Sequence, residues 1–495
     1  MRVGLAMFVL LFRLRSVDYM RMIIRITITK IIPTFNKGTA SRFLLLNILF
    51  WKVSPIIGFQ GIMQTSFGAR QAGMGGAFQG VGGSVMDLES NPSHLARLAG
   101  PKFEIGTSGH FPKIKYSDSF MDQSSALIYE NNINESPRAI FPYIGYIAPV
   151  SSRLGVGVAL YSQGGGGGSF SNITRISQGK ESLNDTLRAN VPLLGTDRKV
   201  KEDLEFKFML SKLTFGSGYR FRKLCLGIGI DLVYAFMEMK KTNQDMSRSL
   251  RLPGSLAYSS DPSYAFSGKL GLSYELTDVI RVAYSYTARS VLHLDGTMKI
   301  EDVNPIIQNV SRVSRNMIWP DRHVFGISYH KSSWIFDLDI KFIPWSQSFR
   351  TSKFALEQPL LTTPIGTETN TMLMNFRWRD QYCFAFGMEY QWNYGIRLRS
   401  GYSYAKTPTT PQGLNPMLGT TNEHHLAGGI GYYAENSAIH FAIEYGFPKT
   451  IKGSEFSDWS LAHSVFSKNE IQLYQFQFAK SVSVLSMYLG FEKNI

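Results

Sequence analysis

Cysteine is almost absent from this chain, which has 495 residues but only two thiols, Cys225 and Cys383. Two thiols cannot supply a disulfide framework, and no spacing of Cys and His residues indicates a zinc site. We therefore expect two isolated, buried thiols, no metal ion and no other cofactor.

Charged residues are also few, at 18% of the chain, and no run of like charges reaches five residues. The net charge of +15 is concentrated near the N-terminus, where residues 1–58 contain nine Lys or Arg and a single acid, Asp18. The remainder lacks basic clusters interleaved with stacking aromatics, which are typical of nucleic-acid-binding surfaces. We expect no nucleic-acid partner.

Apolar runs of the roughly 20 residues that a membrane-spanning helix needs are missing as well. Two shorter runs occupy residues 5–12 and 43–51. The second follows a polar, basic stretch at 36–42 and precedes Gly58, an order that resembles a secretory signal cleaved near Gly58. We assign residues 1–57 to this leader; its first part looks over-extended, with Met20 or Met22 as the start. The alternative interpretation is a membrane-anchoring helix.

What the chain has in abundance is apolar residues at every second position. In one segment Leu224, Leu226 and Ile228 share a face, and Gly227 and Gly229 share the other. Similar alternation recurs near 102–111, 139–149, 153–162, 204–221, 263–275, 279–291, 321–331, 336–342, 384–392, 396–404, 422–433, 439–445 and 470–492. Strands of about ten residues with this period are typical of transmembrane β-barrels, whose outer face is apolar and whose lumen is polar.

Short turns alternate with long polar stretches between these strands. The turns are at 222–223, 277–278, 331–332, 393–394 and 435–436, and the long stretches at 164–203, 241–262, 292–320, 350–379, 407–421 and 448–469. Such asymmetry is typical of the periplasmic and extracellular ends of a Gram-negative outer-membrane barrel. Because bacterial barrels have even strand numbers, our count of fourteen or fifteen favours fourteen, with 470–492 as one strand. The sequence predicts an all-β fold, a transmembrane antiparallel β-barrel over 101–495. A soluble all-β protein is the alternative.

Residues 58–100 break the alternation and are rich in glycine, including Gly73, Gly75 and Gly76. A segment that precedes the first strand can hang in the periplasm or fold into the lumen. Its small size and few charges favour the lumen, so we predict a plug, or hatch, over 58–100.

Several motifs resemble one family. They are Gly58-Phe59-Gln60, then Phe67-Gly68-Ala69-Arg70-Gln71-Ala72-Gly73-Met74-Gly75-Gly76-Ala77-Phe78, then Asn91-Pro92-Ser93, with Trp319-Pro320-Asp321, Pro344-Trp345-Ser346-Gln347 and Trp378-Arg379-Asp380-Gln381-Tyr382 in the barrel. Over nearly all of 58–492 the chain resembles the outer-membrane long-chain fatty acid transporter family of the FadL/TodX type. The family pattern usually has Ala after Asn-Pro, where this chain has Ser93.

This resemblance implies a fourteen-stranded barrel with an N-terminal hatch inside. It implies uptake of fatty acids or aromatic hydrocarbons through a hydrophobic pocket in the lumen, with exit sideways through the wall. Asn91 and Pro92 would then lie in the part of the hatch that restricts passage, and Phe59 would touch the pocket. Outer-membrane lipid, lipopolysaccharide and the barrel-assembly machinery are the other partners we expect.

Four cations, Arg281, Lys341, Arg397 and Arg399, are candidates for the polar inner wall of the pocket, because one of them could pair with a carboxylate head group. The alternative is that they pair with acids such as Asp337, Asp339 and Glu389 and hold the plug. Both interpretations remain open at this point.

Other motifs carry no catalytic signature. The run Gly164 to Gly168 lacks a following Gly-Lys-Ser/Thr and predicts a mobile external loop or a strand break. No Gly-x-Ser-x-Gly elbow occurs. We predict an uptake channel for hydrophobic molecules and not an enzyme. The alternatives are a structural or assembly barrel that does not transport, and an outer-membrane hydrolase or adhesin.

Overall fold

The computed structural model describes residues 61–122, 126–176, 199–249, 255–300, 310–361, 368–414, 416–453 and 474–495. The predicted leader and Phe59 lie outside this range. Within it, no helix is both long and apolar enough to cross a bilayer. Cys225 and Cys383 are free and buried, as predicted.

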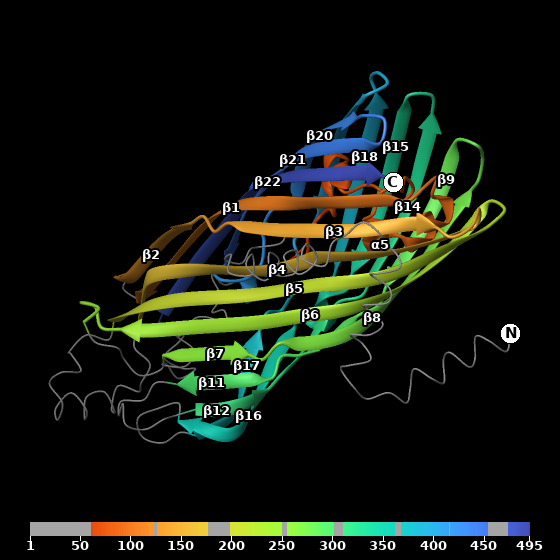
Figure 1. Ribbon diagram of the computed structural model, residues 1–495. Coiled ribbons are helices and arrows are strands. Elements are labelled where there is room, and N and C mark those ends of the chain that lie inside the picture. Colours follow the sequence, from red (N-terminus) through yellow and green to blue (C-terminus); the bar gives the residue numbers. More distant parts are fainter. Residues whose placement is uncertain are drawn as a thin grey trace, which may run out of the picture. The chain divides into compact units, whose positions relative to one another are not determined.

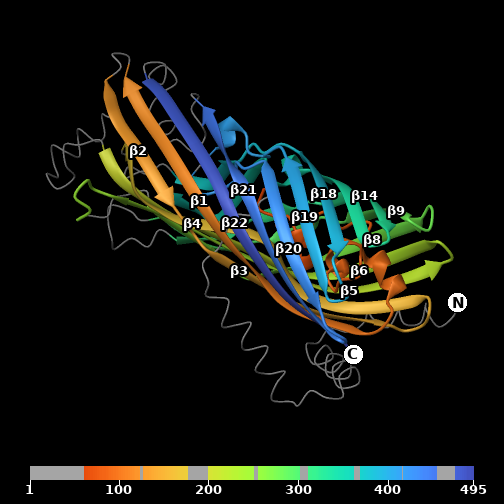
Figure 2. The same cartoon turned by 90° about the horizontal axis from the view of Figure 1, so that it is seen from above.

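Fourteen strands of the described residues pair antiparallel in one closed ring (Figures 1 and 2). The ring closes because the last strand pairs with the first along its whole length, from Lys102 opposite Asn494 to Asp122 opposite Tyr474. The predicted strand number and the single long C-terminal strand are confirmed. In ring order the strands are β1 (Lys102–Asp122), β3 (Ala139–Pro149), β4 (Leu154–Ile176), β5 (Lys199–Phe221), β6 (Leu224–Gln244), β8 (Ser263–Glu275), β9 (Ile280–Thr287), β14 (Arg322–Lys331), β15 (Trp334–Ile343), β18 (Gln381–Gln391), β19 (Ile396–Ala405), β20 (His424–Tyr433), β21 (Ser437–Gly453) and β22 (Tyr474–Asn494).

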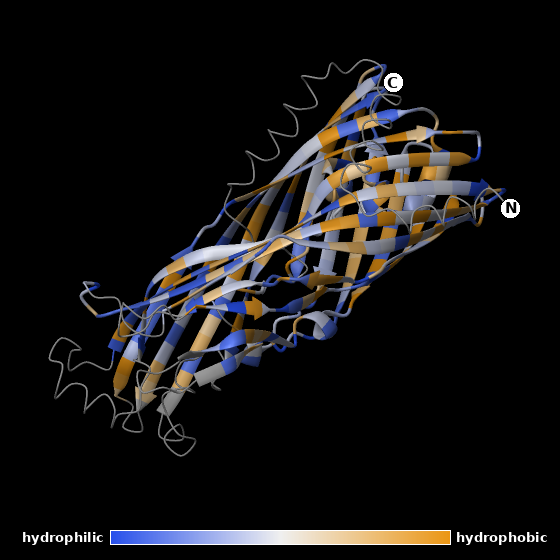
Figure 3. Cartoon of the chain, turned by 60° about the horizontal axis from the view of Figure 1, so that its bottom comes forward, coloured by the Kyte–Doolittle hydropathy of each residue, from blue (hydrophilic) through white to orange (hydrophobic). Residues whose placement is uncertain are grey.

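Alternation along each strand sorts the side chains between the two faces of the wall, and Figure 3 shows the resulting bands of hydropathy. On β6 the outward residues from Leu224 to Phe236 are apolar, whereas inward Asp231 is fully buried. At about 3.3 Å per residue and a tilt of about 45°, this stretch spans about 28 Å, close to the apolar band of a barrel in a bilayer. Charged Glu238 and Lys240 follow it on the same outward face.

The two ends of the ring differ. At one, the short-turn end, β5 and β6 are joined by two residues, as are β14 and β15, at the turns that contain Arg222 and Ser332. At the other, the long-loop end, further strands continue the wall. They are β2 (Leu127–Glu135), β7 (Leu256–Ser260), β11 (Gly296–Ile300), β12 (Val310–Ser314), β16 (Thr351–Leu361) and β17 (Glu368–Asn375), while β10 (Ser290–His293) pairs with β13 (Asn316–Trp319) in a separate sheet.

The prediction that 164–203 and the other long stretches are loops is therefore wrong in part. Residues 164–176 and 199–203 belong to β4 and β5, and β7, β11, β12, β16 and β17 lie in other predicted loops. These segments extend the wall past the apolar band. Water can cover their outer face there, so the alternation that reveals a lipid-facing strand is not required.

The plug lies inside the ring. Its helices are α4 (Ala69–Gly73), α5 (Asp87–Ser90) and η1 (Pro92–Arg97). Helix α4 packs against β19 to β22, and η1 packs against β3 to β6 and β8, so the plug contacts opposite parts of the wall. Figure 2 shows it in orange, enclosed by the strands. Inward-facing glycines permit this packing: a Cβ on Gly401 would lie 2.1 Å from the Met74 carbonyl carbon.

One test of the outward assignment uses a single strand. Ile443, on the outward face of β21 within the apolar band, is 40% exposed, and Thr450 lies farther along the same strand, beyond the band. Ile443→Arg should lower the free energy of unfolding in lipid vesicles by about 2–4 kcal/mol, and Thr450→Arg by about 0–1 kcal/mol. Urea titration followed by tryptophan fluorescence measures both. Equal losses would contradict this placement of the bilayer.

Candidate functional site

A charge cluster fastens α4 to the wall. Glu389 of β18 accepts hydrogen bonds from Arg70 of the plug at 3.1 Å, from Arg399 at 2.6 Å and from Arg397 at 3.3 Å. Glu389 and Arg399 are almost completely shielded from solvent, and Arg70 is 11% exposed. Because an unpaired buried charge is costly, this carboxylate stabilises the plug in the lumen.

A second set of polar contacts holds the plug backbone from Gly76 to Val81. Asp339 of β15 accepts from the Phe78 backbone N–H at 2.9 Å. Lys341 donates to the carbonyl oxygen of Gly76 at 3.0 Å, and Arg281 donates to that of Val81 at 3.0 Å. The four predicted wall cations thus all bind the plug or Glu389, which is the geometry of the alternative interpretation. None of these contacts involves a substrate, so their predicted role in a pocket remains untested.

The predicted hatch residues lie in the tightest parts of the plug. Gly75 has φ +65° and Gly76 has φ +83°, a backbone region that side chains disfavour. A Cβ on Gly75 would lie 2.7 Å from the Tyr402 backbone nitrogen, and one on Gly73 would lie 3.2 Å from Arg399. These glycines let the α4 segment lie directly on β19.

Asn91 and Pro92 begin η1. The Asn91 side chain accepts from the Ser93 N–H at 3.1 Å and donates to the Leu272 carbonyl at 3.3 Å, so it caps the helix and ties it to β8. Pro92 occupies the first helical position, where its missing N–H costs nothing. Ser93 stands where the family pattern usually has Ala, and its hydroxyl adds to these contacts. It donates to the Asn91 side chain at 2.8 Å and lies 3.2 Å from the Ser273 hydroxyl.

The wall is interrupted beside β4. The β3–β4 ladder ends at Tyr143 opposite Tyr161, although β4 continues to Ile176 in pairing with β5. Beyond that point the free edge of β4 is joined by the plug: Met63 forms a bridge with Gly164, and the Gly165 N–H donates to the Ile62 carbonyl at 2.9 Å.

On the other side of the interruption, residues 136–138 separate β2 from β3 and include Pro137, which has no N–H for a ladder. The five-glycine run therefore belongs to strand β4, which is continuous from Leu154 to Ile176 with a bulge between Ser162 and Gly164. Both the loop and the strand-break predictions for this run are wrong; it is the ladder with β3 that ends beside it. A Cβ on Gly164 would lie 2.4 Å from the Ile62 carbonyl, so glycine lets the plug pair there.

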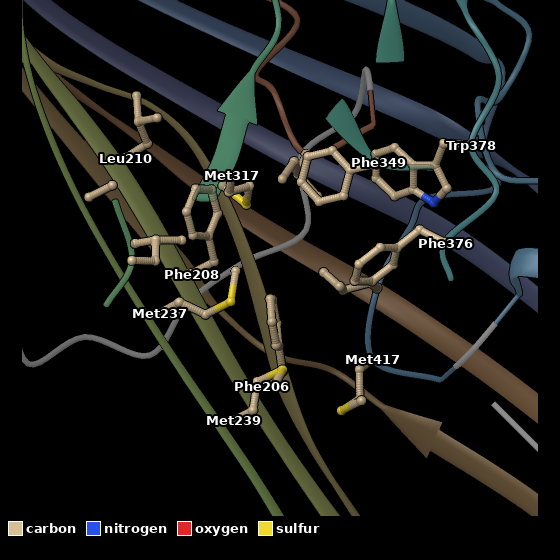
Figure 4. Close-up of a cluster of buried hydrophobic side chains, with 14 of the residues drawn as sticks. Phe206, Phe208, Leu210, Met237, Met239, Met317, Phe349, Phe376, Trp378 and Met417 are labelled. Atoms are coloured by element: carbon tan, nitrogen blue, oxygen red, sulfur yellow. The ribbon is translucent and has the colours of Figure 1, made fainter. Parts of the chain in front are cut away.

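Apolar side chains fill the lumen between the plug and the long-loop end, and we call this group the lumen cluster. The members labelled in Figure 4 come from β5, β6 and β13, from the end of α7 (Trp345–Ser348), and from the connections between β17 and β18 and between β19 and β20. Phe349 stacks on Trp378 at 4.8 Å between ring centroids, and Trp345 meets Trp378 edge-on at 5.3 Å. Members include Ile62, Met63, Phe206, Phe208, Leu210, Met237, Met239, Met298, Met317, Trp319, Trp345, Phe349, Phe354, Phe376, Trp378 and Met417.

One cation lies at the wall of the lumen cluster. Arg315 is 2% exposed, and its guanidinium lies 4.4 Å from the centre of the Phe354 ring. Its Nε donates to the Ser352 hydroxyl at 2.8 Å, and Nη1 contacts the Met237 sulfur. Among the described residues, no carboxylate forms an ion pair with this guanidinium. The indole N–H groups of Trp319 and Trp378 also have no hydrogen-bond partner there.

Sequence reasoning missed both Arg315 and the lumen cluster. One signal was present: Phe206, Phe208 and Leu210 are large inward-facing residues where the barrel pattern predicts polar ones. Arg315 carried no signal, because it lies in a stretch predicted as a loop and its apolar neighbours come from distant segments.

Removing the charge of Glu389 should loosen the plug. Glu389→Gln leaves three guanidinium groups without their carboxylate, at a cost of about 3–5 kcal/mol for a broken buried pair. We expect faster proteolysis of the plug and larger ion conductance in planar bilayers. The control is Glu238→Gln, which removes a half-exposed pair with Lys207. Unchanged conductance and proteolysis in Glu389→Gln would contradict the fastening role.

The buried Asp87 carboxyl should contribute a loss of plug stability as pH rises from about 4 to about 7. Burial raises the pKa of the Asp87 carboxyl to about 7, although the N–H groups of Gly83 and Ser84 and the charge of Arg70 oppose this. The folded plug then keeps a proton that the unfolded chain loses, so this contribution falls through the window by up to about 1.4 kcal/mol per pH unit and levels off above it. Buried His94 acts in the opposite sense. Burial lowers its pKa to about 3, so below about pH 6.5 the unfolded chain binds a proton that the folded plug does not, and the His94 contribution to stability rises with pH.

Proteolysis of the plug across pH 4–8 measures this dependence. Asp87→Asn keeps an oxygen acceptor for both N–H groups and removes the falling contribution, so stability of this variant should rise with pH relative to the parent chain. Asp261→Asn, at an exposed residue paired with Arg312, should leave the profile as in the parent chain. A profile that keeps its slope in Asp87→Asn would refute the assignment.

Comparison with known proteins supports the fold. The structure is similar to that of a Pseudomonas aeruginosa FadL homologue, with a TM-score of 0.66, 12% identity, and coverage of 88% of this chain and 99% of that chain. It is also similar to the P. putida toluene transporter TodX, with a TM-score of 0.62, 18% identity and coverage of 87% and 99%. For the Ralstonia pickettii toluene transporter TbuX the TM-score is 0.55, at 17% identity and the same coverage.

No curated protein matches the sequence. The family model described as outer membrane protein transport protein (OMPP1/FadL/TodX) matches residues 210–491, more than half of the chain. Together with the closed, plugged barrel, this match shows that the chain belongs to the OMPP1/FadL/TodX family of outer-membrane transport proteins.

Proposed function

We propose that this barrel takes up hydrophobic molecules that carry one anionic head group, such as long-chain fatty acids, and catalyses no reaction. The observation that carries the proposal is the buried Arg315 guanidinium, which lies at the wall of the apolar lumen cluster and has no acid partner among the described residues. A carboxylate would supply the missing charge, and a charge-assisted hydrogen bond is among the strongest that a pocket can offer.

The lumen cluster suits the rest of such a molecule. Burial of apolar surface is worth about 25 cal/mol per Å², or about 0.8 kcal/mol for each CH₂, so a long chain gains affinity along an apolar wall. Six methionines of the cluster, including Met237 and Met317, are flexible and can repack around a ligand. The unpartnered indole N–H groups of Trp319 and Trp378 are donors for oxygens of the head group.

A neutral aromatic hydrocarbon is the second candidate substrate, favoured by the aromatic rings in the lumen cluster. TodX and TbuX, similar in fold, are toluene transporters. Such a substrate would bury its surface in the same way but would leave Arg315 without a partner. A barrel that keeps the plug but transports nothing is the remaining alternative.

We further propose that substrate leaves sideways at the interruption beside β4. The plug residues Ile62 and Met63 occupy the free edge of β4 there and also belong to the lumen cluster. A small shift of this plug edge would open the cluster toward the bilayer. The hatch residues Asn91 and Pro92, with Gly73, Gly75 and Gly76, would hold the rest of the plug in place and restrict polar solutes. Phe59, which precedes this edge, keeps its proposed contact with the pocket, and insertion is proposed to use the barrel-assembly machinery.

Arg315 distinguishes the two substrate classes. Arg315→Gln removes the charge and keeps a polar side chain, so binding of a long-chain fatty acid should weaken about 10- to 100-fold. Binding of the fatty acid methyl ester and of toluene should change less than threefold. The matched control is Arg312→Gln, three residues away, where the side chain is 53% exposed and paired with Asp261.

Calorimetry on the purified barrel in detergent gives the affinities, and labelled fatty-acid uptake by cells tests transport. Equal weakening for the acid and its ester would mean that Arg315 only maintains packing. Tighter binding of toluene than of fatty acid by the parent chain would favour the second candidate. If cells with correctly inserted protein take up no fatty acid, the remaining alternative, a barrel that does not transport, would be favoured.

A further inference from the structure

The outward face of β1 changes its chemistry twice along its length. Near the short-turn end its outward residues are mostly apolar, with Thr107 the one polar side chain, and they end with Phe111, which is 38% exposed. The next two outward positions are Lys113 and Lys115, and the two after them are Ser117 and Ser119. Because alternate residues of a strand share a face, all of these side chains point away from the lumen.

The neighbouring strands repeat this order at the same level. On β22, Lys113 and Lys115 lie opposite Ser483 and Ser481. The exposed residues Met487, Leu489 and Phe491 lie on the same strand, nearer the short-turn end. On β21, exposed Tyr445 and Phe447 precede Thr450 and Lys452. Strands β2, β1, β22 and β21 lie side by side in the wall (Figure 2), and we call their outward face the basic strip.

Four cations lie on or directly beside the basic strip, just beyond the apolar band. Lys113, Lys115 and Lys452 lie on β1 and β21. Arg138 lies between β2 and β3, beside residues 111–113 of β1, because Glu135 pairs with Ile114 and Ala139 pairs with His110. All four are exposed, and none forms an ion pair with a carboxylate of the described residues.

A polar groove continues the basic strip toward the long-loop end. It has a volume of about 520 Å³ and is lined by Ser117, Ser119, Asn132, Gln477, Lys452 and Glu130, among others. Hydroxyl and amide side chains that both donate and accept hydrogen bonds suit the hydroxyls of a sugar.

A second outer groove, of about 350 Å³, serves as a comparison. Its lysines, Lys207, Lys240 and Lys299, are accompanied by Glu205 and Glu238, and Lys207 pairs with Glu238 at 3.3 Å. Its charges are therefore largely balanced within the wall. Of these two surfaces, the basic strip has the larger excess of positive charge next to the apolar band.

We propose that the basic strip binds a phosphorylated glycolipid of the outer leaflet, lipopolysaccharide. Its acyl chains would lie on the apolar residues of β1, β22 and β21, its phosphates would contact Lys113, Lys115 and Arg138, and its sugars would occupy the polar groove. The three layers of the surface follow the order of the three parts of this amphiphile. The long-loop end is the extracellular end of a bacterial barrel, where this lipid is found. The proposal does not depend on which substrate the lumen takes.

The experiment compares two triple variants of the full chain in detergent micelles. The test variant is Lys113→Gln, Lys115→Gln, Arg138→Gln, and the control variant is Lys207→Gln, Lys240→Gln, Lys299→Gln, which removes the same charge from the second groove. The probe is purified lipopolysaccharide, with binding followed by native mass spectrometry. The test variant should bind about 100-fold more weakly, since each cation near a charged lipid surface contributes about a factor of five. The control should change less than threefold.

Further arms identify the ligand. Lipid A without its core sugars should bind the parent chain more weakly than complete lipopolysaccharide, and inorganic phosphate and phosphatidylglycerol should compete poorly. Equal loss in both variants would mean nonspecific charge attraction and would overturn the proposal, as would effective competition by inorganic phosphate or phosphatidylglycerol. Fatty-acid binding, measured on the same samples, should be unchanged in both variants, which separates this proposal from the proposed function and confirms that both remain folded.

Discussion

Inside a bilayer no water is present to bond the backbone, so each N–H and C=O of a spanning segment needs a partner within the protein. In this chain the requirement is met by the pairing of β22 with β1, which removes the sheet edge that an open sheet would expose. Closure also determines how side chains are arranged on the two faces of the wall. Every strand has one face toward lipid and one toward the lumen, and the charged side chains that lipid excludes gather inside.

Those inward charges explain how the plug is held. A buried carboxylate or guanidinium needs a partner, and the plug supplies many of them: Arg70 for Glu389, backbone N–H groups for Asp339, and backbone carbonyls for Lys341 and Arg281. Inward glycines such as Gly401 bring the two backbones close enough for these bonds. Barrel and plug are therefore complementary, and each satisfies polar groups that the other buries.

The sites that we propose for substrate, exit and lipid lie where this complementarity ends. Beyond the plug the lumen becomes apolar, and Arg315 is a buried cation there without an acid partner among the described residues. Beside β4 the ladder of the wall ends, and a plug edge replaces a strand. On the outside, the basic strip begins where the apolar band stops. Each of these places differs from the rest of the wall in a way that motivates one of the three proposals.

The sequence by itself determined the barrel, because lipid imposes a strict two-residue period that Leu224 to Phe236 and its counterparts obey. It also determined the strand number within one and the existence of a glycine-rich plug. The leader, the domain boundary at 58 and the role of Phe59 remain predictions, since they fall outside the described residues.

Only the tertiary structure decided that β7, β11, β12, β16 and β17 extend the wall, because strands covered by water need no strict period. Only it decided that Arg281, Lys341, Arg397 and Arg399 face plug or wall groups, and that Arg315 faces the lumen cluster. The partners of a buried charge come from segments hundreds of residues apart, as with Arg70 and Glu389, and local pattern carries no information about such pairs.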